Sequence, residues 1–598
     1  MLSLLNADIS ARLFAYSPVF VCLILSAALV ILPRILLKKV DPHTIPESAS
    51  RFAEKADRIL FQRSDLNQQR LTMLLMILGV GIAYALRLAL RFPPVFPLDD
   101  AYITLHNAQV LRSGNDPNYL GIPALVGATS GVHLVLTACA LPFFSRSEWA
   151  LDAVAWVGVL FYATGLLRLA FAFKASLIQS LLLATVGLCA GKTVFHLFNG
   201  LETGLAMGAL CWALALSVRE VSGIASVQND SEGDNSDVVS EGIEQTPRFT
   251  RFDSFVRDTA FPTFLGMLPF IRPEFILISL MLLVLRSVSR WKNKETALTA
   301  ASAFGKDIAF VAIGAFPWLT LSFANTGSFF PQTIAAKRAF FAETRPLHFV
   351  LVQYAPFLFR IMQVQLGIGI FGALLLPFHK IGRISFAFIA LFLLAYLTQM
   401  PGALLWNEQR YLYLLTPFAL LGCASMFLQK KEFARSIGNI LLVAAFFQTI
   451  IAVPTNWSQY VGYCEKNKIQ LLGLREWCLQ NLPAGSKIAV HDAGAISWET
   501  PFVLTDLVGL KSPKSVEFHK QYTFPSRGKL RAKAISSILV ESHADYLILI
   551  VGWDKLYHFS DDLTAEGWRL EALRPNKPIY QVYKISPPGE RKTVEGRQ

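Results

Sequence analysis

The sequence predicts an all-α polytopic membrane domain followed by a C-terminal extracytoplasmic α/β domain. Hydrophobic residues make up 53% of the 598-residue chain and charged residues only 16%, which is too little polar surface for a soluble globule. Apolar segments of roughly 20 residues, the length that crosses a hydrocarbon core of about 30 Å, recur along the chain. From about Thr455 the composition changes to that of a soluble domain.

The apolar segments predict about eleven or twelve transmembrane helices. The predicted spans are 17–33, 71–91, 149–172, 176–193, 203–218, a broken pair at 260–271 and 274–287, then 307–324, 349–377, 384–400, 411–428 and 437–453. The stretch 131–144 is too short to span, and we expect a helix lying on the outer surface there.

The distribution of Lys and Arg predicts the orientation of these spans. The loop between the first two spans, residues 34–70, is rich in Lys and Arg and is therefore expected in the cytoplasm. Crossing 71–91 then places Asp99 and Asp100 outside. Much of the net charge of +13 belongs to cytoplasmic loops beside anionic membrane lipids, so it indicates topology and no nucleic-acid partner.

Three regions follow from this pattern. Residues 1–70 form an extra N-terminal transmembrane helix and a basic cytoplasmic loop, and 71–454 form the main transmembrane domain. Within the latter, 220–257 has the composition of a disordered cytoplasmic linker. Residues 455–598 form the external domain, with a helix in KNKIQLLGLREWCLQNL and strands in SKIAVHD, DYLILIVGW, WRLEAL and PIYQVYKIS.

Polar residues predicted at the outer ends of the spans are the candidate site, because such groups are costly in a bilayer and mark a site when several converge. They are Asp99, Asp100, His106, Glu202, Arg272, Glu274, Lys337, Arg338, Glu408 and Arg410. An acidic pair beside several cations can hold a lipid-linked phosphate while a carboxylate deprotonates an acceptor hydroxyl. A GxGxxG motif that follows a strand is absent, and so are the GxxxxGK[ST], HExxH and GxSxG motifs of soluble enzymes.

Short motifs spread over most of the chain carry a family resemblance. They are DDAYITLHNAQVLRSG at 99–114, NGLETG at 199–204, RPE at 272–274, PQTIAAK at 331–337, RYLYLLTP at 410–417, and IAVHDAGAISW with DLVGL in the tail. In their order and placement the chain resembles bacterial membrane glycosyltransferases of the GT-C superfold. Within that superfold it is most similar to the DDAYI-motif group that includes the mycobacterial terminal arabinofuranosyltransferase family.

The resemblance implies an inverting transfer of a hexosyl or pentosyl unit from a polyprenyl-phosphate donor to a cell-envelope glycan or lipid acceptor. It places the reaction on the outer face of the bacterial inner membrane. In that superfold an Asp of the first external loop serves as general base, and motif position assigns this role to Asp99, with Asp100 beside it. Residues expected to bind the donor phosphate or substrate are Lys337, Arg410, Tyr411, Glu202, Arg272 and His106.

Each of these residues also has a structural interpretation. The acid pair could cap the helix that starts at Ala101, and Glu202 could be a first-turn acid of the next helix. A salt bridge between Arg272 and Glu274 would join two helix ends, and Arg410 could reach lipid headgroups. For His106, a solvated surface position is the default expectation.

Two other functions and the metal question stay open at this stage. A transporter or flippase of lipid-linked sugars would also need polar groups near the outer face, and a non-catalytic envelope glycan-binding protein could use the external domain. Neither related halves nor a chain of mid-span acids, both typical of transporters, is present in the sequence. The acid pair could also bind Mg²⁺ or Mn²⁺, although adjacent residues at a helix start point apart.

Overall fold

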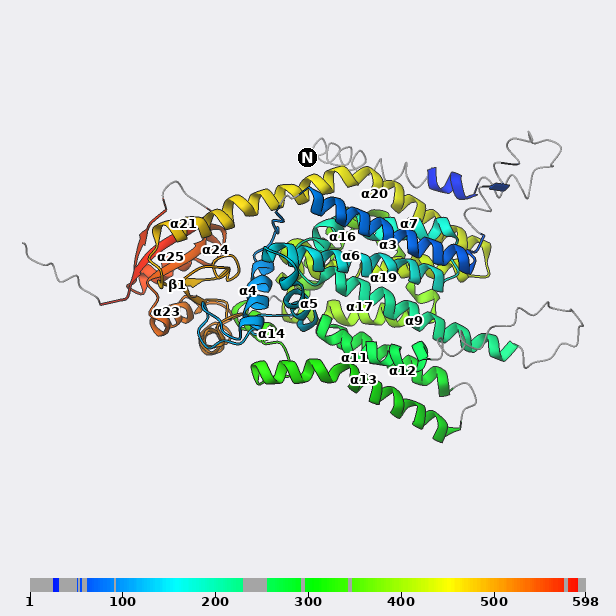
Figure 1. The fold of residues 1–598 in the computed structure, drawn as a ribbon, viewed down its shortest axis with the longest axis horizontal. Helices are drawn as coiled ribbons and strands as arrows, with labels where there is room; N and C mark the ends of the chain where they lie inside the picture. The colour runs from blue at the N-terminus through cyan, green and yellow to red at the C-terminus, as the bar shows by residue number, and fades with distance from the viewer. Residues whose placement is uncertain are drawn as a thin grey trace, which may run out of the picture.

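The computed structural model describes residues 25–31, 51, 54–55, 62–90, 93–229, 255–291, 296–342, 347–574 and 579–589. A long bundle of helices joins a smaller domain built on a β-sheet, which confirms the predicted fold class (Figure 1). Most of the predicted span 17–33 and residues 230–254 of the predicted linker lie outside the described residues.

The helical domain contains most of the helices. Their bounds are α3 Leu66–Ala89, α4 Asp100–Ser113, α5 Gly131–Ala140, α6 Ser147–Ala172, α7 Leu177–Cys189, α8 Thr193–Leu197, α9 Thr203–Asn229, α11 Phe261–Ile271, α12 Phe275–Trp291, α13 Ala297–Thr326, α14 Thr333–Phe340, α15 Leu347–Phe349, α16 Ala355–Leu366, α17 Lys380–Gln399, α18 Trp406–Tyr413, α19 Thr416–Ser425 and α20 Glu432–Asn467. Six of the described helical segments are long and apolar enough to cross a membrane, or seven if one bent pair counts as a single span. This is a multi-pass membrane domain by length and composition.

The predicted boundaries differ from the structure most clearly in three places. The predicted span 349–377 bends by 117° close to Gly367, whose positive φ of 59° interrupts the helix. Helix α9 continues to Asn229, into the range predicted as a linker. Helix α20 and the residues after it stay helical to Asn481, across the predicted domain boundary at 455. The polar residues after 454 mark the end of the apolar segment, but they contain no signal that stops a helix.

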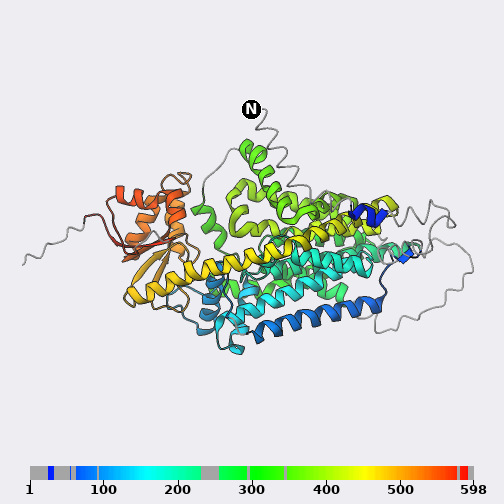
Figure 2. The same ribbon diagram turned by 90° about the horizontal axis from the view of Figure 1, so that it is seen from above.

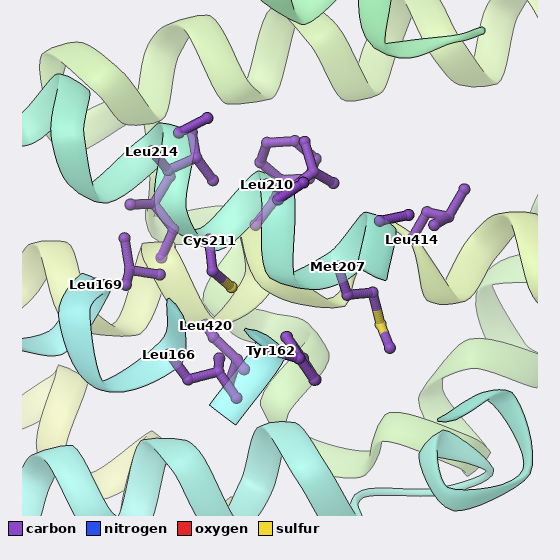
Figure 3. Packing of buried hydrophobic residues seen from close by; sticks show 14 of the residues in the cluster. Tyr162, Leu166, Leu169, Met207, Leu210, Cys211, Leu214, Leu414 and Leu420 are labelled. Carbon is purple, nitrogen blue, oxygen red and sulfur yellow. The ribbon is translucent and has the colours of Figure 1, made fainter. Parts of the chain in front are cut away.

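Helices α6 and α9 form the centre of the bundle, with apolar side chains of both helices interdigitating (Figure 3). The two backbones approach closely at Gly208, where an added Cβ would lie 2.9 Å from the backbone nitrogen of Tyr162. Small residues commonly permit such contacts between membrane helices. The α6–α9 pair is therefore closely packed along the centre of the helical domain.

The C-terminal domain is a five-stranded mixed sheet in the order β2-β1-β3-β5-β4. Strand β1 pairs in parallel with β2 and β3, while β5 pairs antiparallel with β3 and β4. The bounds are β1 Lys487–Val490, β2 Val503–Asp506, β3 Tyr546–Ile550, β4 Arg569–Ala572 and β5 Tyr580–Ser586, with helices α21 Gly473–Asn481, α22 Pro513–Phe518, α23 Arg531–Ser542, α24 Val551–Tyr557 and α25 Phe559–Ala565. Four strands match predicted segments, and β2 was not predicted.

The two domains share a hydrophobic core. Phe96, Tyr102 and Leu105, from the segment before α4 and from α4 itself, pack among buried residues of β1, β2 and β3. In both ribbon views α20 runs from the bundle into the sheet domain (Figures 1 and 2), and α4 lies between the two. Helix α4, which begins with the acid pair, is therefore held from both sides.

Candidate active site

A small polar pocket forms where α4, α14 and α18 meet the loop before α9. Asp100 lies on it with its side chain 32% exposed. The Asp100 Oδ2 atom accepts a hydrogen bond from Asn407 Nδ2 at 3.0 Å and lies 3.5 Å from Arg410 Nη1. Other residues of the pocket include Thr104, Ser130, His133, Glu202 and Lys337. The structure thus brings together a carboxylate and two cations at the predicted outer end of the bundle.

A cluster of buried charged and aromatic groups is continuous with this pocket through Glu202 and Arg410. The guanidinium of Arg272, which is fully buried, is bound by Glu274 through both carboxylate oxygens and by Glu202. Tyr396 donates a hydrogen bond to Glu274. The guanidinium groups of Arg272 and Arg410 both lie over the Tyr411 ring, 5.0 and 5.2 Å from its centre. The predicted Arg272–Glu274 salt bridge is present, and Arg272 acts through its neighbours, since it does not line the pocket.

Lys337 and Arg410 converge on the hydroxyl group of Tyr411. The Lys337 Nζ atom lies 3.4 Å and the Arg410 Nη2 atom 3.5 Å from this oxygen. Among the described residues, no carboxylate lies within salt-bridge distance of Lys337, whereas Arg410 faces Asp100. Lys337 is therefore the cation of the pocket whose charge is least compensated, and a bound anion would find its counter-charge there.

Asp99 occupies a different position from Asp100. Its carboxylate turns toward the C-terminal domain and accepts two hydrogen bonds of 2.8 Å from the backbone N–H groups of Gly494 and Ala495. Burial raises the pKa of Asp99 well above its usual range, Asp492 raises it further, and the two N–H groups oppose this change. Asp99 makes no side-chain cap of α4 and does not line the pocket. Its contacts join the domains.

The expectation that His106 is a solvated surface residue is wrong, because its side chain is buried. It is only 3% exposed and binds both carboxylate oxygens of Asp116 at 3.0 Å, away from the pocket. Lys511 of the C-terminal domain completes this cluster, with its Nζ atom 3.2 Å from Asp116 and 2.8 Å from Asn107 Oδ1. His106 therefore belongs to an ionic contact between the domains.

The cluster of His106, Asp116 and Lys511 is expected to make the stability of the protein depend on pH. Although burial alone would raise it, the pKa of Asp116 falls to about 2 because His106 donates a hydrogen bond and Lys511 supplies positive charge. A lowered carboxylate pKa stabilises the fold above the unfolded-state value of 3.8, and this contribution is lost as the pH falls toward 2. We expect Asp116→Asn to destabilise domain docking by about 2 kcal/mol at pH 7.

Thermal unfolding at pH 7 and at pH 3 measures this effect. The difference between wild type and Asp116→Asn should shrink at the lower pH. Asp561→Asn, at a side chain that is 84% exposed on the surface of the C-terminal domain, is the matched control and should leave unfolding unchanged. An equal loss of stability in both variants would contradict the role assigned to the cluster.

A large apolar cavity adjoins the polar pocket. It has a volume of about 440 Å³ and lies between α11, α12 and α13, where Trp318, Phe329 and Phe330 contribute to its wall. Ala128 and Thr129 line both the cavity and the pocket. An elongated ligand with an apolar chain and a charged head could therefore occupy the two together.

The two adjacent acids have different partners in the structure. One carboxylate binds the C-terminal domain and the other faces Asn407 and Arg410. Within the described ranges, no group of three or more His, Cys, Asp and Glu side chains comes together in a way that could hold a metal ion.

Of the eight residues that the sequence analysis assigned to catalysis or to substrate binding, six gather in or directly behind the pocket. They are Asp100, Glu202, Arg272, Lys337, Arg410 and Tyr411. Sequence reasoning did not select Asn407, His133 or Tyr396, although Asn407 lies within the WNEQR segment that contributed Glu408 and Arg410.

Comparisons with known proteins give the following similarities. The family model described as a domain of unknown function, DUF8728, matches residues 457–583. A search of curated proteins found no sequence match. Among solved structures, ArnT from Cupriavidus metallidurans bound to undecaprenyl phosphate is 11% identical, with a TM-score of 0.45, over 88% of this chain and 99% of its own. The oligosaccharyltransferase of Archaeoglobus fulgidus tethered with an acceptor peptide is 11% identical, with a TM-score of 0.42, over 86% of this chain and 74% of its own.

Proposed function

We propose that the protein is an inverting GT-C membrane glycosyltransferase that moves a sugar from a polyprenyl-phosphate donor to an envelope glycan or lipid acceptor outside the inner membrane. The observation that carries the proposal is the polar pocket, in which the partly exposed Asp100 carboxylate lies beside Arg410 and Lys337 at the edge of an apolar cavity. This set supplies a base, counter-charges for a phosphate, and space for a lipid chain.

The pocket supports one arrangement of donor and acceptor. The donor's lipid chain lies in the apolar cavity, and its phosphate lies near Lys337 and Arg410 in the polar pocket. One donor molecule can occupy both spaces because Ala128 and Thr129 line the cavity and the pocket alike. Asp100 accepts the proton of the acceptor hydroxyl. The acceptor oxygen then bonds to the anomeric carbon, the bond from that carbon to the phosphate oxygen breaks, and the leaving polyprenyl phosphate takes the electron pair.

Asp100 is a better base than Asp99 in this proposal. Both oxygens of Asp99 already accept backbone hydrogen bonds, whereas Asp100 is exposed to the pocket. Single displacement inverts the configuration at the anomeric carbon. A general acid is unnecessary because a phosphate is a stable leaving group, and cations that neutralise it lower the barrier.

The test is a transfer assay with the purified protein in lipid nanodiscs. Radiolabelled polyprenyl-phosphate hexoses and pentoses are incubated with membrane glycan and lipid acceptors, and label transfer is measured. Donor-dependent transfer by wild type, lost in Asp100→Asn, is the expected result. Donor binding without consumption by either protein would instead favour a transporter or a glycan-binding protein.

Lys337→Gln is expected to raise the KM for the donor about tenfold, the equivalent of about 1.4 kcal/mol of lost charge-assisted binding. The control is Arg338→Gln. Arg338 is the neighbouring exposed cation, which lies over the Phe524 ring at 5.5 Å and does not line the pocket. Initial rates at varied donor concentration measure both variants. Equal changes in the two would assign the effect to general surface charge.

A further inference from the structure

His133 of α5 lines the polar pocket and has no role in the mechanism proposed above. The residue is only 3% exposed, and its ring nitrogens form no hydrogen bond with any residue that the structure describes. In contrast, the buried His106 and His519 both bind protein groups through their rings. A buried polar side chain without a partner is uncommon, so a ligand is the expected partner of His133.

The ring nitrogens of His133 are accessible from the pocket. They are not among the unpartnered polar atoms that protein encloses completely, whereas both ring nitrogens of His491 are. Because His133 is otherwise enclosed and lines the pocket, its accessible nitrogens face the pocket. A small group that enters the pocket can therefore reach the imidazole.

His133 is uncharged at neutral pH. Burial lowers the pKa of His133 to about 4, although Glu202 opposes this change, and α5 is not one of the candidate membrane spans. The Glu202 carboxylate is instead bound by Arg272. A neutral imidazole offers one N–H donor and one acceptor nitrogen. This pair suits a hydroxyl group, which both donates and accepts, whereas a phosphate prefers the cations Lys337 and Arg410.

The position of His133 indicates which substrate meets it. The backbone N–H of His133 donates to Ser130 Oγ at 3.2 Å, which fixes His133 in the first turn of α5, just after Ala128 and Thr129. Those two residues line both the apolar cavity and the pocket, and the proposed donor passes between the two spaces there. The transferred sugar is bonded to the donor's phosphate and is therefore the part of the donor beside His133.

The size of the pocket limits which hydroxyl group of that sugar can reach the imidazole. The pocket has a volume of about 40 Å³, and since about 10–15 Å³ holds one water, it admits roughly three small polar groups and no sugar ring. A phosphate oxygen beside Lys337 and an acceptor hydroxyl beside Asp100 account for two of them. The third place suits the hydroxyl on C2 of the donor sugar, because C2 is bonded to the anomeric carbon and its hydroxyl lies nearest the phosphate.

We propose that His133 binds the C2 hydroxyl of the transferred sugar and thereby selects donors in which this hydroxyl is free. The inference rests on the proposed transferase function and names its donor class. A 2-deoxy sugar leaves the imidazole unpaired, and a 2-acetamido sugar carries a group too large for the space that remains. The donor is then a pentose or hexose with an unmodified C2 hydroxyl.

Matched donors test this contact. The probes are tritiated undecaprenyl-phosphate arabinofuranose and glucose, the 2-deoxy analogue of each, and undecaprenyl-phosphate N-acetylglucosamine, and their binding to the full-length protein in nanodiscs is measured. We expect wild type to bind at least one 2-hydroxy donor at least tenfold more tightly than its 2-deoxy analogue and the acetamido donor. His133→Ala should bind the 2-hydroxy donor about tenfold more weakly and the 2-deoxy analogue as wild type does.

Two further variants separate this contact from a general structural effect. His133→Gln still offers a donor and an acceptor and should keep a preference for the 2-hydroxy donor. His348→Ala, at an exposed histidine of α15 outside the pocket, should bind every probe as wild type does. If wild type binds both members of each pair equally, or if His133→Ala weakens both members equally, the inference is overturned. Absence of binding by every probe overturns it as well.

The two proposals fail in different ways. Equally efficient transfer by wild type from 2-deoxy donors and from their parent sugars would refute the His133 contact and leave the transferase standing. A preference for the 2-hydroxy donor in binding that is lost in His133→Ala, with no transfer by wild type, would refute the transferase and identify a transporter or binding protein for lipid-linked sugars.

Discussion

Asp100→Asn is expected to lower the rate of sugar transfer by about 10²- to 10⁴-fold, the usual contribution of a positioned general base. The substituted amide keeps the shape of the side chain and still accepts the hydrogen bond from Asn407 Nδ2. It cannot take the proton of an acceptor hydroxyl. Because Asp100 is one-third exposed, the fold should tolerate the change.

Single-turnover transfer, donor binding and thermal unfolding together measure this effect. In Asp100→Asn only transfer should fall. Asp99→Asn is the informative comparison, since an amide can accept only one of the two hydrogen bonds from Gly494 and Ala495. We expect it to lower the unfolding temperature. If Asp99→Asn abolishes transfer at unchanged stability while Asp100→Asn stays active, the base is Asp99 and the assignment made here is wrong.

The fold class followed from the sequence because apolar length and local charge are strong signals in membrane proteins. The short helix at 131–144 and the broken pair around Pro273 were predicted within a few residues. The bend at Gly367 and the continuation of α20 were not, because a single glycine is a weak signal and polar residues extend helices readily. Strand β2 is only four residues long, and its pairing with β1 depends on distant residues.

For the site, the sequence could supply residue types but not their directions. Asp99 and Asp100 are adjacent, yet one faces the C-terminal domain and the other the pocket. The sequence suggested a surface position for His106 because its partner Asp116 lies ten residues along the chain. Lys511, which pairs with Asp116, belongs to the C-terminal domain. The left-handed segment 407–409 contains no glycine, so nothing in its composition signals its conformation.

The tail motif IAVHDAGAISW has a structural role, because it contacts Asp99. Its Gly494 and Ala495 donate to Asp99, and an added Cβ on Gly494 would lie 2.2 Å from the backbone oxygen of Asp99. No side chain fits there without moving the two segments apart. The interface contact at Asp99 therefore lies directly beside Asp100, the residue we propose as the base.

Gly494→Ala, which adds a single methyl group, is therefore expected to destabilise the docking of the C-terminal domain strongly. The shift it forces would break two hydrogen bonds to a buried carboxylate, at a cost of about 3–5 kcal/mol. Limited proteolysis near the domain junction and thermal unfolding in detergent measure the loss. The control is Gly552→Ala in α24, where an added Cβ meets nothing within 4 Å.

Transfer should fall in Gly494→Ala even under conditions in which the protein remains folded. Displacing the start of α4 by about 1 Å moves the base away from its working position, and misplacement on that scale can lower a rate by about 10²-fold. Donor binding should survive, because Lys337 and Arg410 come from α14 and α18 and not from α4. If transfer and stability both match wild type, the Asp99 contact does not set the position of the catalytic loop, and the C-terminal domain must act on the reaction by some route other than Asp99.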